Sequence, residues 1–351
     1  MKIAQIAPLA ESVPPRLYGG TERVVSYLTE ELVRLGHDVT LFASGDSATR
    51  AKLVACAPRA LRLDPRTKDT LPSLSVMLER VRQRAHEFDV LHFHIESVHF
   101  PLFRALARKT VTTLHGRLDL PELPPFFREF PEMPLVSISG SQRRAAPNAN
   151  WAGTVYHGLP AEICPLNPVA PRGAGRYLAF LGRVSPERGL DRAIEVARRS
   201  GLRLRIAARV DREDEHYWRE YIVPLLHDPR IEFIGEVDES GKPAFLGNAT
   251  ALLFPIHWPE PFGLAMIEAM SCGTPVIAWR HGAVPEIVED GITGFIVDSV
   301  DAAVSALPRA AALDRTRVRN RFDERFSAAR MTRDYLSVYR ALGRSRALRA
   351  L

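Results

Sequence analysis

Short apolar runs alternate with helical patterns along almost the whole chain, and this alternation limits the folds open to it. In the first half, the runs that predict strands are KIAQIAP, DVTLFAS, DVLHFH, TVTTLHG, LVSIS and GTVYHG. Helical patterns separate them; the clearest runs from Gly20 to Leu35 and stops at Gly36, and another lies near residues 74–88. Strand, helix and strand in succession predict a parallel sheet with helices on both faces.

A segment rich in proline and glycine, PAEICPLNPVAPRGAG at residues 160–175, interrupts the alternation. Strand patterns resume after it with RYLAFLGR, LRLRIAAR, RIEFIGEV, ALLFPI, TPVIAWR and TGFIV. We therefore expect an α/β chain of two doubly wound, Rossmann-like domains, residues 1–163 and 176–328, with a linker at 164–175. Residues 329–351 are expected to form a helix that crosses back toward the N-terminal domain. Ligands collect at the carboxyl ends of the strands in such sheets, so an interdomain cleft is the expected site.

The length and the composition agree with two globular domains. A chain of 351 residues is long for a single core and fits two domains of roughly 150 residues each. No apolar run approaches the roughly 18 to 20 residues of a membrane span, and the first residues resemble a strand rather than a signal peptide. Cys56, Cys164 and Cys272 are widely spaced, which favours free buried thiols in a reducing compartment. We therefore expect a cytoplasmic protein.

The net charge of +6 is concentrated at the C-terminal end of the chain. Residues 309–351 hold 12 arginines and 4 acidic residues, a net charge of +8, which leaves −2 for the rest. Within this tail, Leu336, Tyr339 and Leu342 share one helical face with arginines around them. Two interpretations remain open: a helix docked on the protein, or a helix that contacts an anionic membrane surface or an acidic partner. Nucleic acid is not expected, because neither half holds a recognised binding module.

Features suited to an anion follow the first expected strand of each half. Arg183 ends the run RYLAFLGR, and Arg188 follows in the loop SPERG. Two guanidinium groups from one loop can hold a diphosphate through charged hydrogen bonds, although two surface arginines would give the same pattern. In the first half, Gly19 and Gly20 precede a helix, where paired glycines let an anion approach the helix N-terminus. A glycine pair is also typical of an ordinary turn.

Two glutamates, Glu260 and Glu268, lie eight residues apart in PEPFGLAMIEAMSCGTP. Pro261 disfavours helix at Glu260, so we expect Glu260 in a loop and Glu268 in the second turn of the helix that follows. The free amides of Gly263 and Leu264 at the helix start would face a bound phosphate. A carboxylate beside a diphosphate is unfavourable unless it accepts hydrogen bonds from sugar hydroxyls. We therefore predict that Glu268 binds a ribose and Glu260 a transferred sugar.

This stretch, EPFGLAMIEAMSCGTPVIA, followed by GAVPEIVEDGITGF, resembles the E-x7-E region of the family-four retaining glycosyltransferases of the GT-B fold. The resemblance extends to GRVSPERGL at residues 182–190, YGGTERVV at 18–25 and TLHG at 113–116, and so covers nearly the whole chain. It implies transfer of a sugar from a nucleotide diphosphate sugar to a hydroxyl acceptor, with the anomeric configuration retained and without a metal.

The resemblance also implies a role for each residue that matches the family's motifs. His115 matches an active-site histidine beside the donor sugar, and Val237 falls where the family's backbone meets the base. Arg188 stands where the family usually has a lysine. The arginine keeps the positive charge but has a different side-chain length and geometry. The residues expected in catalysis are His115, Arg183, Arg188 and Glu260; those expected to bind the donor are Gly19, Gly20, Arg183, Arg188, Val237, Glu260, Phe262, Gly263, Leu264 and Glu268. His94 and Glu96, in the first domain, are predicted to contact the acceptor.

No metal or other cofactor is expected. The Asp-x-Asp pair that commonly holds the cation in metal-dependent sugar transferases does not occur in this chain, so arginines and helix dipoles would stabilise the leaving diphosphate. We expect front-face attack, in which the leaving phosphate oxygen takes the acceptor's proton. His92, His94 and His99 suggest a metal site only weakly, and one of them could line the cleft. The acidic run DREDE at residues 211–215 is interpreted as a solvated loop at a helix start.

Three other functions remain open. A glycoside hydrolase would also use two carboxylates but would need neither arginine. A nicotinamide dehydrogenase would suit the fold, but GxGxxG is absent after either first strand. A non-catalytic nucleotide-sugar binding protein would keep the same residues and show no turnover. Among donors we favour a UDP-sugar over GDP-mannose, because the expected base site offers mainly backbone.

Overall fold

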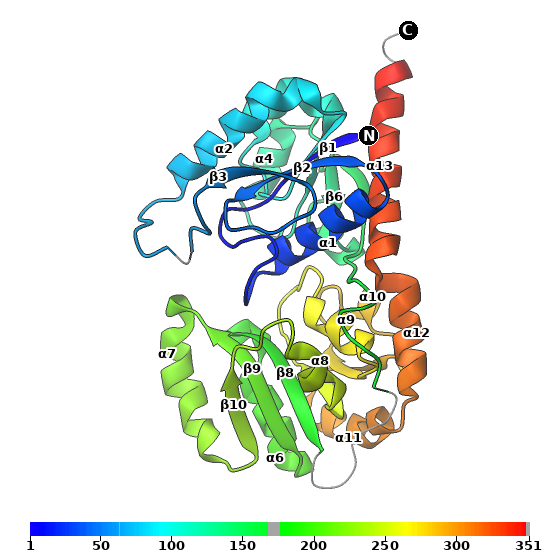
Figure 1. Ribbon diagram of the computed structural model, residues 1–351. Helices are drawn as coiled ribbons and strands as arrows, with labels where there is room; N and C mark the ends of the chain where they lie inside the picture. The colour runs from blue at the N-terminus through cyan, green and yellow to red at the C-terminus, as the bar shows by residue number, and fades with distance from the viewer. Residues whose placement is uncertain (63, 168–175, 349–351) are drawn as a thin grey trace. The chain divides into compact units, whose positions relative to one another are not determined.

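The computed structural model describes residues 1–62, 64–167 and 176–348, and it divides the chain into two units. The first unit combines Met1–Gly158 with Ala328–Leu351, and the second is Leu159–Ser327. Each unit holds one parallel sheet, so the predicted pair of Rossmann-like domains is confirmed (Figure 1). Most of the predicted linker, residues 168–175, lies outside the described residues, as do the last three residues of the tail.

The sheet of the first unit is parallel throughout, in the order β3-β2-β1-β4-β5-β6-β7. Its strands are β1 (Lys2–Ile6), β2 (Asp38–Ser44), β3 (Lys52–Ala57), β4 (Val90–Phe93), β5 (Thr110–Thr113), β6 (Leu135–Ser137) and β7 (Trp151–Thr154). The strand order reverses between β1 and β4, where Ile3 pairs with Val39 on one side and with Val90 on the other. Strand β3 is absent from the sequence-based prediction, although residues 53–57 form a short apolar run; it lies at the sheet edge, and only its last two residues are buried.

Helices cover both faces of this sheet. They are α1 (Gly20–Arg34), α2 (Leu71–Arg84), η1 (Ala85–Glu87), α3 (Phe100–Phe103), η2 (Arg104–Lys109), α4 (Leu123–Glu129), α5 (Gly140–Ala145) and α13 (Ala328–Leu348). The predicted end of α1 is confirmed: Gly36 takes a positive φ of 81° and its amide donates to the Val33 carbonyl. The N-cap of α5 is Ser139, whose hydroxyl accepts a hydrogen bond from the Gln142 amide.

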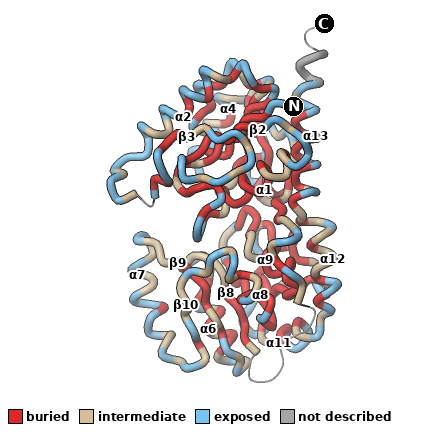
Figure 2. The backbone as a smooth tube through the Cα atoms, in the orientation of Figure 1, coloured by how far each residue is buried: buried red, intermediate tan, exposed pale blue. Residues whose placement is uncertain are grey.

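In the first unit, buried residues follow the strands of the sheet and exposed residues lie mainly on the outer helices and loops (Figure 2). On one face, Phe42, Phe93 and Phe103 belong to an aromatic-rich core that α2 and α3 cover. On the other face lies α13, with Tyr335 and Tyr339 fully buried. Leu336 is buried as well, so the tail helix is docked on the protein.

The second unit has a six-stranded parallel sheet in the order β10-β9-β8-β11-β12-β13. Its strands are β8 (Tyr177–Val184), β9 (Arg203–Val210), β10 (Ile231–Gly235), β11 (Ala251–Phe254), β12 (Val276–Trp279) and β13 (Gly294–Val297). Its helices are η4 (Pro186–Arg188), α6 (Leu190–Ser200), η5 (Arg212–Asp214), α7 (Glu215–Tyr217), η6 (Trp218–Ile222), η7 (Val223–His227), α8 (Lys242–Gly247), α9 (Leu264–Ser271), α10 (Val284–Ile287), α11 (Val300–Ala311) and α12 (Arg315–Phe326). The order reverses between β8 and β11, which makes the carboxyl ends of these two strands the expected ligand position.

Two expectations from composition can be compared with the described residues. The cysteines Cys56, Cys164 and Cys272 are all free and buried, as predicted. Within residues 1–62, 64–167 and 176–348, no helix has both the length and the apolar character that crossing a bilayer requires.

Candidate functional site

The candidate donor site of the second unit is built on the loops that follow β8 and β11. The strand order reverses between these two strands, and this place is called the switch point of the sheet. The loops are joined by a hydrogen bond from the His257 amide to the Glu187 carbonyl, 3.1 Å long. Gly189 follows the first loop with a positive φ of 67°, and a Cβ there would lie 2.2 Å from the Pro255 carbonyl oxygen. Only glycine lets the two loops approach this closely. Backbone packing therefore fixes the position of Arg188 relative to the segment that carries Glu260.

Arg188 and Glu260 form an ion pair within this frame. Arg188 Nη1 lies 2.6 Å from Glu260 Oε2, and the side chains are 21% and 9% exposed. The guanidinium carbon also lies 5.6 Å from the ring centroid of Trp258. A cation held between a carboxylate and an aromatic face keeps a defined position before any ligand arrives. The structure therefore brings together two residues that the sequence predicted for one site.

The backbone of Glu260 is held as firmly as its side chain. Its carbonyl accepts a hydrogen bond of 2.9 Å from the Ala283 amide, and its own amide donates to the Trp258 carbonyl at 2.8 Å. A Cβ on Gly282 would lie 2.3 Å from the backbone nitrogen and oxygen of Glu260, and the φ of Gly282 is positive at 54°. The loop after β12 thus supports the loop after β11, and a glycine is required at their contact.

Helix α9 begins directly after this loop, as predicted. Gly263 is the residue before its first turn, with a φ of 91° that suits glycine, and Leu264 starts the helix. A Cβ on Gly263 would come within 2.7 Å of Met266 Cε, so this glycine also has a packing role. Phe262 is buried, with its ring centroid 6.2 Å from that of Phe326. The phosphate contact proposed for the amides of Gly263 and Leu264 stays a prediction.

Glu268 lies in the second turn of α9, and a residue absent from the sequence-based site contacts it. Lys242 Nζ lies 2.6 Å from Glu268 Oε1, and the two side chains are 10% and 7% exposed. Lys242 also lies 3.4 Å from Glu239. Lys242 is the first residue of α8, which follows the loop that carries Val237. No signal in the sequence distinguishes this lysine from a surface residue at a helix start.

Arg183, the residue before the last in β8, is held by acidic residues of the run DREDE, which is predicted to be a solvated loop. Its guanidinium lies 3.6 Å from Asp211 and 3.4 Å from Asp214. The interpretation of a solvated loop is wrong for these two carboxylates, which turn inward because Arg183 and Arg209 attract them. Arg209, the residue before the last in the neighbouring strand β9, pairs in register with Arg183 and lies 2.7 Å from Asp211. Burial raises the pKa of Asp214, because its carboxylate loses solvent.

The register of β8 and β9 could have revealed part of this cluster from the sequence. Both strands are predicted from the runs RYLAFLGR and LRLRIAAR, and each run ends in an arginine. Adjacent parallel strands bring such residues side by side, so uncompensated arginines there would repel each other. The acidic run that follows β9 supplies the compensating charge.

The predicted donor residues of the first unit occupy a tightly packed turn. Gly19 precedes α1, and Gly20 is its first residue. A Cβ on Gly19 would meet Pro15 at 2.7 Å, so close packing against Pro15 is one reason for glycine here. Contact of these glycines with a phosphate remains a prediction.

Buried histidines form a hydrogen-bonded chain behind the switch point of the first sheet. His94 Nε2 lies 2.8 Å from Gln5 Oε1, and His94 Nδ1 lies 3.0 Å from His115 Nε2. The Gln5 amide donates to the Tyr339 hydroxyl, which lies 2.7 Å from His92 Nδ1. Burial lowers the pKa of His92 and His94 far below the usual value and that of His115 to about 3. The three rings are therefore neutral at pH 7.

Neutral rings fix the hydrogen positions along this chain. Gln5 Oε1 can only accept, so His94 Nε2 carries the proton and donates to it. His94 Nδ1 then accepts from His115 Nε2–H. This leaves Nδ1 of His115 as a bare acceptor, which can receive a hydrogen bond from a sugar hydroxyl. His94 itself is 1% exposed with both ring nitrogens engaged, so it orients His115.

Glu96 supports the same loop from its other side. Its carboxylate accepts hydrogen bonds from the amides of His115 and Gly116, at 3.1 and 3.0 Å. Glu96 has a positive φ of 53°, a conformation uncommon outside glycine that often marks functional loops. Direct contact of His94 and Glu96 with an acceptor remains a prediction.

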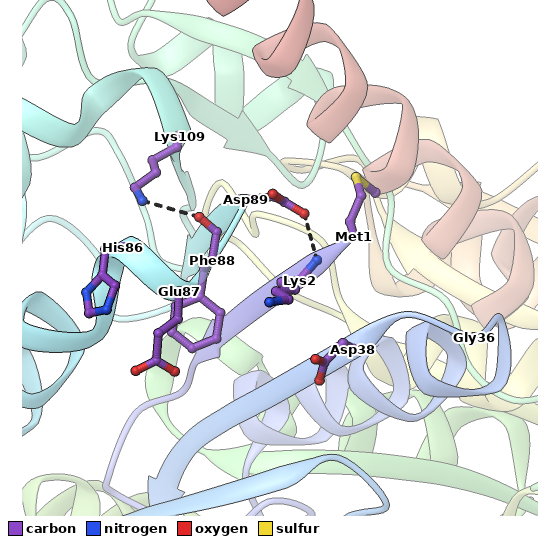
Figure 3. Close-up of a pocket in the computed structure, with 9 residues that line it drawn as sticks. All are labelled: Met1, Lys2, Gly36, Asp38, His86, Glu87, Phe88, Asp89 and Lys109. Atoms are coloured by element: carbon purple, nitrogen blue, oxygen red, sulfur yellow. Dashed lines mark hydrogen bonds between the residues drawn. The ribbon is translucent and has the colours of Figure 1, made fainter.

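A separate polar pocket of about 530 Å³ opens in the first unit (Figure 3). It lies at the amino ends of β1 and β2, where the Lys2 amide donates to Asp89, and Lys109 donates to the Phe88 carbonyl. Ligands of doubly wound sheets bind at the opposite, carboxyl edge, and no predicted site residue lines this pocket. We therefore assign the candidate site to the strand ends and not to this cavity. Among the described residues, no group of three or more histidines, cysteines or acidic residues is arranged to hold a metal.

Comparisons with known proteins agree with this geometry. The model for "Glycosyltransferase Family 4" matches residues 18–156, and that for "Glycosyl transferases group 1" matches residues 168–326, so together they span nearly the whole chain. The chain belongs to the glycosyltransferases. With its two Rossmann-like units, this glycosyltransferase has the GT-B fold that the sequence predicted.

Named relatives of this glycosyltransferase include a mannosyltransferase and a glycogen synthase. It is 27% identical to the phosphatidyl-myo-inositol mannosyltransferase of Mycobacterium leprae over 346 residues, 92% of this chain and 90% of the relative. It is 25% identical to a glycogen synthase of Mycobacterium tuberculosis, over 91% of this chain and 86% of that one.

Solved structures share the fold at lower identity. Sucrose-phosphate synthase from Thermosynechococcus elongatus superposes with a TM-score of 0.78 at 18% identity, covering 98% of this chain and all of that one. Anabaena HepE in complex with UDP and glucose has a TM-score of 0.74, also at 18% identity, covering 97% of this chain and all of HepE.

Proposed function

We propose that this glycosyltransferase moves a sugar from a nucleoside diphosphate sugar to a hydroxyl acceptor, with retention of configuration and without a metal. The observation that carries the proposal is the pair of Arg188 and Glu260 at the switch point of the second sheet, next to the start of α9. An arginine and a helix N-terminus suit a diphosphate, and a carboxylate suits sugar hydroxyls. A hydrolase would not need this cationic side of the site.

We favour a UDP-sugar as donor. Support comes from Anabaena HepE, a structural neighbour whose complexes hold UDP with glucose and UDP-glucose. The mannosyltransferase among the relatives makes GDP-mannose the competing donor. We further propose a cytoplasmic protein whose arginines on α13 contact an anionic membrane surface, and we expect no nucleic acid partner.

In the proposed reaction, the bond between the anomeric carbon and the phosphate oxygen breaks and its electron pair leaves with the diphosphate. Arg183, Arg188 and the amides at the start of α9 stabilise the negative charge that develops there. The acceptor oxygen attacks from the same face, and its proton passes to the departing phosphate oxygen. Glu260 holds hydroxyls of the donor sugar, Glu268 those of the ribose, and His115 lies beside the sugar.

The first test is release of a nucleoside diphosphate. Incubation with UDP-glucose, UDP-galactose, UDP-N-acetylglucosamine or GDP-mannose, with candidate acceptors, is expected to liberate UDP or GDP, measured by a coupled luminescence assay. Chelation with EDTA is expected to leave the rate unchanged. Tight nucleotide binding without release from any donor would favour the non-catalytic binding protein instead. Loss of activity in EDTA would contradict the metal-free mechanism.

Asp214→Asn is expected to strengthen the binding of UDP by about three- to ten-fold, because it removes one of the two carboxylates that compete with phosphate for Arg183. Isothermal titration calorimetry at low and high salt measures the effect, which should shrink as salt screens the charges. Glu213→Gln, an exposed neighbour in the same loop, is the matched control. Weaker UDP binding by the Asp214 variant would mean that Asp214 positions Arg183 for the phosphate.

A further inference from the structure

Lys242 is a buried cation of the second unit that the proposed mechanism does not use. Its ammonium group lies 2.6 Å from Glu268 Oε1 and 3.4 Å from Glu239 Oε2. A buried carboxylate without a partner is costly, so an ammonium in this place compensates the Glu268 carboxylate inside the protein. Resting on the proposed function, we infer that Lys242 is a positioning residue that makes the donor site selective for a ribose with free hydroxyl groups.

The start of α8 holds the backbone of Lys242 in place. Asp238 accepts hydrogen bonds at its side chain from the amide of Gly241 and the hydroxyl of Ser240, and at its carbonyl from the amide of Lys242. A Cβ on Gly241 would lie 2.8 Å from Val237 Cγ1, so the segment folds tightly on itself. Lys242 is therefore anchored to the loop predicted to meet the nucleotide base.

The lysine occupies one oxygen of Glu268, and among the residues that the structure describes the other oxygen remains free to accept. A carboxylate has two oxygens with about four acceptor positions, and the contact from Lys242 goes to Oε1. With that oxygen fixed, Oε2 has a defined direction in which to accept hydroxyl hydrogen bonds. Lys242 thus connects two parts of the nucleotide site, the base loop before α8 and the ribose-binding glutamate on α9.

This arrangement has a consequence for nucleotide selectivity. A hydroxyl bound to an oriented carboxylate makes a charge-assisted hydrogen bond, so wild-type protein should bind UDP at least about ten-fold more tightly than 2′,3′-dideoxy-UDP. Without the lysine, Glu268 loses its fixed direction and its compensating charge. The ratio of the dissociation constant of 2′,3′-dideoxy-UDP to that of UDP should then fall toward one, mainly because UDP binds more weakly.

The experiment compares the two nucleotides by isothermal titration calorimetry in wild-type protein and in Lys242→Met. We expect the ratio of the dissociation constants to fall about five-fold or more in the variant, and to be largely restored in Lys242→Arg. Glu268→Gln should lower the ratio to a similar extent, and adding Lys242→Met to it should change little further, because both act through one hydrogen bond. Arg199→Met, which removes an exposed cation of the same unit, is the matched control.

Each outcome decides between roles. If Lys242→Met weakens both nucleotides equally and keeps the wild-type ratio, Lys242 is only structural and the inference is overturned. If Lys242→Met does not fold, Glu268→Gln and Lys242→Arg are compared instead. A ratio of the two dissociation constants that stays at the wild-type value in Glu268→Gln overturns the inference. Wild-type protein that binds neither UDP nor GDP would instead overturn the proposed function, and this inference with it.

Discussion

Glu260→Gln is expected to lower kcat by about 100- to 1000-fold while leaving the affinity for UDP unchanged or higher. The carboxylate is predicted to bind hydroxyls of the transferred sugar, so its loss acts on the transition state and not on the nucleotide. In the structure it also neutralises Arg188 at 2.6 Å. The glutamine keeps the shape of the side chain but frees the charge of Arg188 for the diphosphate.

Two measurements separate these effects. Steady-state kinetics with the donor identified by nucleotide release gives kcat, and calorimetry with UDP gives the dissociation constant. Glu232→Gln, an exposed glutamate of the same unit that pairs with Arg205, is the control and should behave as wild type. A loss of UDP affinity as large as the loss of kcat would place Glu260 in nucleotide binding and contradict the proposed division between Glu260 and Glu268.

Acid is expected to destabilise the first unit by up to about 6 kcal/mol between pH 7 and pH 5.5, or about 1.2 kcal/mol for each of five histidines with a lowered pKa. Burial lowers the pKa of His92, His94, His99, His115 and His157, that of His115 to about 3. In the unfolded chain the pKa of a histidine is near 6.5. Below that pH the unfolded state therefore binds protons that the folded state does not bind. The free energy of unfolding therefore falls as the pH falls below about 6.5.

Hydrogen exchange followed by mass spectrometry, corrected for the intrinsic rates at each pH, measures this loss unit by unit. Peptides from β1, β4 and β5 should lose protection more than peptides from the second unit. In His99→Phe the pH dependence should weaken by about one fifth, because a phenyl ring replaces a ring that stacks on Phe93 at 3.8 Å and removes one titrating group. Protection in the first unit that does not change from pH 7 to pH 5.5 would contradict the prediction.

The sequence predicted the parts of the donor site that depend on local chain geometry. Pro261 and Gly263 mark the loop and the helix start, so the positions of Glu260 and Glu268 relative to α9 follow from nearest neighbours. The strand pattern was equally informative where strands are buried on both faces. It failed at β3, an edge strand in which only the last two residues are buried.

Contacts between residues distant in the sequence could not be read in this way. Lys242 reaches Glu268 because α8 and α9 pack together, which depends on the order of the strands and not on either segment alone. Asp214 turns inward because Arg183 lies beside it on the neighbouring strand. The hydrogen bond between Gln5 and Tyr339 joins the two ends of the chain, a pairing that no local pattern encodes.

The return of α13 to the first unit decides how this chain can be recombined with its relatives. The second unit is one uninterrupted insert, Leu159–Ser327, between two pieces of the first. Tyr339 and Tyr335 from the last piece complete the polar chain around His92 and Thr113. A chimera with a single crossover after Gly158 would take α13 from the other parent. The helix packed against His92 and Thr113 would then come from a different protein. A donor specificity graft needs two junctions, one on each side of the insert, so that the first and last segments stay from the same parent.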